Sequence, residues 1–242
     1  MDIGFYGHSN CAYRSNDSFL DIVANQLGGQ VVNTGVKQGS EERILFELKK
    51  TKKLDLAIIF HCLPKFVFLP NCDRDISVHD IEKKRADDLF RNDHLDVEFN
   101  LENNPKFKTL FKDNTTFFNA VNTYKDFFYD PDLMLNRYYG SLLQIDQYLK
   151  FKNIPAIHIV SKGHPLPTWF LFSNGFVDYS VMDIVKRNES KNPFFVNCIS
   201  KEGNKQVAEE LLNIIAVRGR EVLRLREKQE TEVRIPRPLQ TL

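Results

Sequence analysis

Three short apolar runs alternate with two helical patterns over the first 60 residues, and this rhythm limits the fold more than any other feature. The apolar runs are residues 3–6, 31–33 and 54–60. Between them, residues 16–27 have apolar side chains at helical spacing behind a capping Asn16, and Ser40 can cap a second helix. Because consecutive parallel strands need a helical crossover, this order predicts a parallel sheet with helices on its faces.

The alternation of strand and helix patterns stops after the third apolar run and resumes further along the chain. Residues 63–130 are rich in Asp, Asn, Lys and Phe and carry only short helical patterns. We interpret them as a long helical insertion at the carboxyl edge of the sheet, where loops that carry function are placed. A helix from Asp132 to about residue 152 then leads into a fourth apolar run at residues 156–160.

The last part of the domain is predicted to add one more strand and a long helix. Residues 194–197 form a short apolar run, and apolar residues at helical spacing continue from about residue 200 to about residue 230. The expected fold is therefore a three-layer α/β/α domain over residues 1–230. Its sheet is expected to have five mostly parallel strands in flavodoxin-like order, interrupted by the helical insertion.

Charge and composition exclude several classes of protein. The 242 residues contain 33 Lys and Arg against 32 Asp and Glu, so the net charge is +1 and no global field favours a nucleic acid or an anionic membrane. The sequence has neither an apolar run of about 18 residues nor a signal-type start. We therefore expect a soluble protein made in the cytoplasm. Its four cysteines are too few for a disulfide scaffold of this length.

A serine follows directly on the first predicted strand, in the sequence Gly7-His8-Ser9-Asn10-Cys11. Parallel α/β sheets bind their ligands at the carboxyl ends of the strands, so this serine lies where a reactive group would be expected. A serine hydroxyl needs a base to take its proton and donors to stabilise the oxyanion. We expect the loops after the first three strands, near Ser9, Gly35 and His61, to meet at this edge.

At these residues the chain resembles the SGNH (GDSL-like) hydrolase family, whose first block is a serine turn and whose second is a glycine loop after the second strand. Residues 200–209 are similar to the family's closing block, in which a glycine and an amphipathic helix follow a serine. The resemblance covers about residues 1–62 and 131–216. It implies that Ser9 is the nucleophile and that the backbone N–H groups of Ser9 and Gly35 stabilise an oxyanion.

The same comparison shows where the chain departs from the family. The aspartate of the first block is replaced by His8, and the closing histidine by Cys198, with Val196 or Phe195 where its acidic partner would stand. Residues 60–64 offer no asparagine for the third block. Loss of the base removes most of the rate advantage of a serine triad, because its members act as a unit.

Two hypotheses follow for function. In the first, the chain is an SGNH-hydrolase-like module whose catalytic site is impaired and whose role is binding or assembly. In the second, it is an active serine esterase or deacetylase in which Ser9 works with a substitute base, and His61 and His164 are the candidates. The resemblance implies an ester or an acetylated glycan as the ligand, and it extends to SGNH-like domains encoded by tailed phages, which indicates a virion setting.

No cofactor and no metal are predicted. Histidines and cysteines recur near the predicted strand ends, but their spacing matches no zinc motif. Residues 231–242 hold Pro236 and Pro238 and no helical period, so we interpret them as an extended arm. Such an arm gains order by docking, and the expected partner is a protein or a second copy of the chain, with no nucleic acid and no membrane.

Overall fold

A computed structural model describes most of the predicted α/β domain. The described residues are 1–7, 11, 18–35, 39–64, 66–68, 75–77, 114–160, 165–166, 170–173, 176–178 and 201–233. Several sequence-predicted features lie outside them: Ser9, His164, Cys198, the strand at residues 194–197 and most of the insertion.

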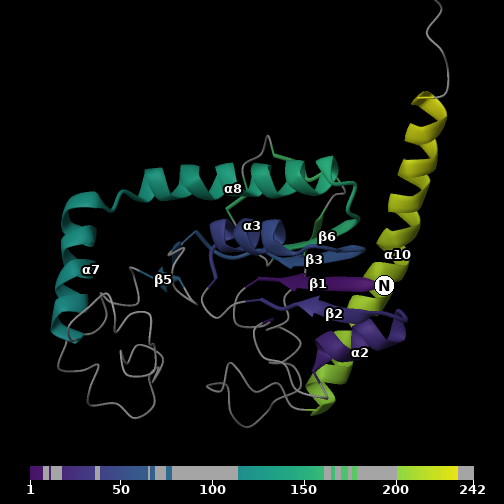
Figure 1. The fold of residues 1–242 in the computed structure, drawn as a ribbon, viewed down its shortest axis with the longest axis horizontal. Helices are drawn as coiled ribbons and strands as arrows, with labels where there is room; N and C mark the ends of the chain where they lie inside the picture. Colours follow the sequence, from purple (N-terminus) through teal and green to yellow (C-terminus); the bar gives the residue numbers. More distant parts are fainter. Residues whose placement is uncertain are drawn as a thin grey trace, which may run out of the picture.

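The core of the structure is one sheet in which every strand pairing is parallel (Figure 1). Its strands are β1 (Asp2–Tyr6), β2 (Gln30–Asn33), β3 (Leu56–Phe60), β6 (Ala156–Val160) and β7 (Phe176–Asp178), in the order β2-β1-β3-β6-β7. The α/β class and the parallel sheet are thus confirmed. Four of the strands lie where apolar runs predicted them, whereas β7 comes from a stretch in which no strand was predicted.

Helices cover both faces of this sheet (Figure 1). On one face, α2 (Phe19–Gln26) and α10 (Lys201–Val233) pack on the side chains of Ile3, Phe5 and Ile58. On the other face, α3 (Glu41–Lys50) and α8 (Pro131–Phe151) pack on Tyr6, Ala57 and Ile59. The alternation along each strand sends successive side chains to opposite faces, so each central strand is buried on both sides.

The ends of the helices show where the sequence prediction was right and where it was wrong. Ser40 caps α3, as predicted, and its hydroxyl accepts the N–H of Arg43. The cap of α2 is Ser18 and not Asn16, because the Ser18 hydroxyl accepts the N–H of Asp21 at the first turn. Asn204 of α10 accepts the N–H of Phe19, which ties the start of α2 to the last helix.

The longest helix is α10, whose C-terminal part extends beyond the sheet in Figure 1. It continues to Val233, so residues 231–233 are helical and the predicted extended arm begins later than expected. The rest of that arm lies outside the described residues. The described part of the insertion contains an antiparallel pair, β4 (Phe66–Val67) with β5 (Ile76–Ser77), and the helix α7 (Asn114–Phe128). None of the described helices is long and apolar enough to span a bilayer.

Candidate functional site

The described residues at the ends of β1, β2 and β3 lie close together at the carboxyl edge of the sheet. A Cβ atom on Gly7, after β1, would lie 2.6 Å from the carbonyl oxygen of Phe60 at the end of β3. A Cβ atom on Gly35, after β2, would lie 2.6 Å from both the carbonyl oxygen of Gly7 and Cβ of Cys11. The two glycines therefore allow the backbones to approach more closely than side chains would permit. Of the sequence-predicted site residues, Ser9 and His164 lie outside the described residues, and Gly35 and His61 lie within them.

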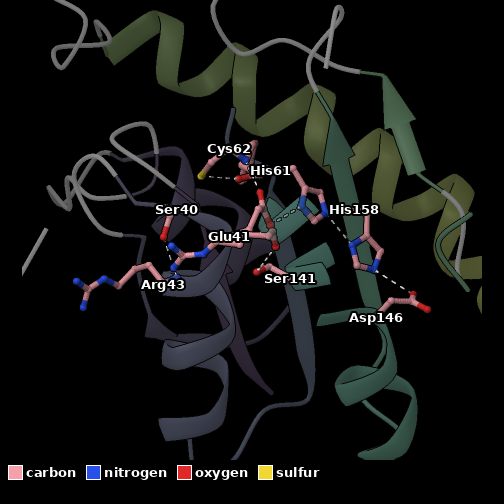
Figure 2. Close-up of polar contacts among 10 residues, drawn as sticks. Ser40, Glu41, Arg43, His61, Cys62, Ser141, Asp146 and His158 are labelled. Atoms are coloured by element: carbon pink, nitrogen blue, oxygen red, sulfur yellow. Dashed lines mark hydrogen bonds and ion pairs between the residues drawn. The ribbon is translucent and has the colours of Figure 1, made fainter. Parts of the chain in front are cut away.

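His61 is buried in a chain of polar contacts below this edge (Figure 2). Its Nδ1 lies 3.0 Å from Oε2 of Glu41, and its Nε2 lies 2.9 Å from Nδ1 of His158. The other oxygen of Glu41, Oε1, accepts the backbone N–H of Cys62 at 2.6 Å. Both ring nitrogens of His61 thus have a partner inside the protein.

Strand register brings the two histidines together. In the β3–β6 pairing, Ile59 lies opposite His158, and the backbone N–H of His61 continues the ladder to the carbonyl of Ile159. Since side chains two positions apart on a strand share a face, His61 lies on the same face as Ile59, toward α3 and α8. His158 reaches that face from β6, so the two imidazoles face each other across neighbouring strands.

Glu41 is placed by the start of α3. It is the first residue of the helix, where a carboxylate interacts favourably with the helix dipole. The turn is held by Asp75, which accepts the N–H and hydroxyl of Ser40 at 2.7 and 2.6 Å and pairs with Arg43 at 2.9 Å. The side chains of Arg43 and Asp75 are almost completely buried, so this ion pair fixes the helix start against the residues of the insertion.

The chain of polar contacts continues from His158 to α8 and to the residues before β7. Nε2 of His158 lies 3.9 Å from Oδ1 of Asp146, and Asp146 accepts the N–H and hydroxyl of Ser173 at 2.8 and 2.6 Å. The ring of Phe172 stacks on His158 at a centroid distance of 4.1 Å and on His61 at 4.8 Å. Phe172 therefore covers both imidazoles, and the adjacent Ser173 donates two hydrogen bonds to the Asp146 carboxylate.

Burial, and then the neighbouring His61, hold the pKa of His158 well below its ordinary value. His158 is therefore a neutral imidazole at neutral pH, with one N–H and one bare nitrogen. Among the described residues, its Nε2 has no hydrogen-bond partner, since Asp146 lies beyond hydrogen-bond distance. The contact between His61 and His158 requires that one of the two facing nitrogens carries a hydrogen and the other does not.

The sequence drew attention to only part of this network. His61 was noted for its place at a strand end, whereas Glu41 was not singled out as a site residue. His158 and Asp146 were missed, although a histidine inside the apolar run at residues 156–160 and an acid on the buried face of α8 were visible signals. A buried polar residue without a local partner indicates a distant one.

The described residues contain no group of three or more His, Cys, Asp or Glu side chains that could hold a metal ion. Cys11 packs in the cluster on the α2 and α10 face, and Cys62 in the cluster on the α3 and α8 face. Burial raises the pKa of the Cys11 thiol, so this thiol is a packing group and not a reactive thiolate.

No family model matches the sequence, and no curated protein or solved structure matches the chain.

We predict that Gly35→Ala destabilises the protein by about 1–3 kcal/mol, because the added methyl group collides with the Gly7 carbonyl and Cβ of Cys11. Denaturant unfolding measures this change. Gly140→Ala is the matched control: a Cβ atom there has nothing within 4 Å, and alanine in the middle of α8 is expected to stabilise by up to about 1 kcal/mol. Equal effects of both substitutions would show that the loops do not approach as described.

Proposed function

We propose that the chain is an SGNH-hydrolase-like module whose catalytic site is impaired and which serves in binding or assembly. The observation that carries this proposal is the position of His61. Its two ring nitrogens are taken by Glu41 and His158, at 3.0 and 2.9 Å, and its side chain is fully buried. A general base must present a nitrogen within hydrogen-bond reach of the serine proton. The contacts of His61 leave none for Ser9.

The sheet and its loops support the SGNH-like part of the proposal. Counting only the strands of the main sheet, the order is 2-1-3-4-5, the flavodoxin-like arrangement that binds ligands at its carboxyl edge. Gly7 and Gly35 lie at that edge in close backbone contact, as the serine turn and glycine loop of the family require. In contrast, Cys198 occupies the position of the family's catalytic histidine. The resemblance therefore includes the scaffold but not the catalytic base.

The first test is esterase activity. If the site is impaired as proposed, the hydrolysis of p-nitrophenyl acetate is expected to stay near background and to be the same in wild type and Ser9→Ala, since an unactivated serine gives little covalent catalysis. A fluorophosphonate probe, which labels activated serines, should leave the chain unlabelled. A rate that disappears in both Ser9→Ala and His164→Ala would overturn the proposal and establish an esterase with His164 as its substitute base.

The assembly role rests on the last residues of the chain. Residues 234–242 hold three apolar side chains, Ile235, Leu239 and Leu242, too few to order the segment on its own. A segment of this kind gains affinity by inserting spaced side chains into a receiving surface. A second copy of the chain is the partner that we propose, and a virion is a setting in which such arms join identical subunits.

Removal of residues 234–242 is therefore expected to abolish self-association while the melting temperature of the domain is retained. Sedimentation velocity and thermal unfolding measure the two quantities, and α10 stays complete because it ends at Val233. The control replaces the same residues by an equal length of Gly and Ser, which should behave as the truncation does. If the full chain is monomeric, or the truncated chain associates equally well, the arm has no assembly role.

A further inference from the structure

Two adjacent residues contact the pair of buried imidazoles and the carboxylate beside it. Phe172 stacks on both rings with its side chain almost completely buried, and Ser173 donates two hydrogen bonds to Asp146. These residues belong to the segment at 170–173, which lies between β6 and the edge strand β7. The same segment thus keeps water from the rings and holds the carboxylate nearest to His158.

The contact between the rings limits how many protons the pair can hold. At 2.9 Å, Nε2 of His61 and Nδ1 of His158 share one hydrogen, and the pair can take one positive charge with the contact intact. A second charge puts a hydrogen on both facing nitrogens. Two N–H donors at this distance repel each other, so the rings must separate, and two imidazolium ions in the core need water.

The two carboxylates beside the histidine pair, Glu41 and Asp146, are not equally able to stabilise a second positive charge. On α3, Glu41 lies 3.0 Å from His61 and is also bonded to the N–H of Cys62. On α8, Asp146 lies 3.9 Å from His158 and is already bonded twice to Ser173. A proton on Nε2 of His158 therefore competes with Ser173 for the same carboxylate.

Tyr138 of α8, which packs in one cluster with Phe172, is buried, and burial raises the pKa of its hydroxyl, so it adds no charge.

We propose that the Glu41–His61–His158–Asp146 chain is an acid-operated latch, and that entry of a second proton into the histidine pair releases residues 170–173 from α8 and the sheet. Release exposes the rings to water and frees Asp146 to pair with His158. The device is independent of esterase chemistry and of the C-terminal arm. The conformation of residues 170–173, beside the edge strand β7, thus depends on pH.

The amide of Ser173 reports the latch directly, because its hydrogen is bonded to Asp146. We expect its hydrogen-exchange protection, corrected for intrinsic exchange, to be constant above about pH 7. Below about pH 6.5 the opening constant should rise by up to tenfold per pH unit, since His158 takes up one proton in the open state that it excludes in the closed state, where its pKa is lowered. Amides of β1 on the same protein are the internal control and should keep their protection.

Two variants separate the latch from general acid instability. His158→Asn keeps a polar group near the position of Nδ1 but cannot become charged, so the pH dependence at Ser173 should disappear while its protection at pH 7.5 is retained. Phe172→Ala removes the cover, so Ser173 should lose protection at both pH values. Protection at Ser173 that is the same at pH 7.5 and 5.5, or that falls equally in His158→Asn, would overturn the proposal.

Discussion

Buried polar groups need hydrogen-bonding or charged partners, and this constraint helps to determine how β3, β6, α3 and α8 pack together. Glu41 comes from α3, His61 from the end of β3, His158 from β6 and Asp146 from α8, yet they form one chain of contacts on a single face of the sheet. Loss of the Glu41–His61 or the His61–His158 contact would leave a buried polar group unpaired, which costs about 1–3 kcal/mol, a sizeable part of the stability of an ordinary domain. The register of β3 against β6, and the docking of α3 and α8, are therefore specified by polar pairing in addition to apolar burial.

The same constraint explains the chemistry that the site supports. A histidine acts as a base only if a nitrogen is free to approach the reacting group. In this protein His61, at the end of β3, contacts His158 of β6 and Glu41 of α3 with its two ring nitrogens. The glycines at the sheet edge allow a close approach of the backbones, and this approach, together with the occupied nitrogens of His61, is the physical basis on which we propose a scaffold that binds without catalysing.

The fold was more predictable than the site, for reasons that particular residues show. The strands β1, β3 and β6 were visible because each is an apolar run buried on both faces, whereas the shorter edge strand β2 is only partly buried and was visible from its place between two helical patterns. The edge strand β7 has only three residues, too few to show a period. Ser18 and Asn16 both have side chains that cap helices, and only the structure decides between them. The His61–His158 contact joins residues 97 positions apart, and it depends on a strand register that no local pattern contains.

The contact between the two imidazoles is also the most direct point at which the account can be tested. In protein labelled with ¹⁵N at histidine, a hydrogen bond between Nε2 of His61 and Nδ1 of His158 should give a scalar coupling across the bond at neutral pH. The ring of His158 should stay neutral well below pH 6.5, the ordinary histidine pKa. The absence of a coupling, together with a His158 ring that titrates near pH 6.5, would show that the pair is not closed and would return His61 to the candidates for the base of Ser9.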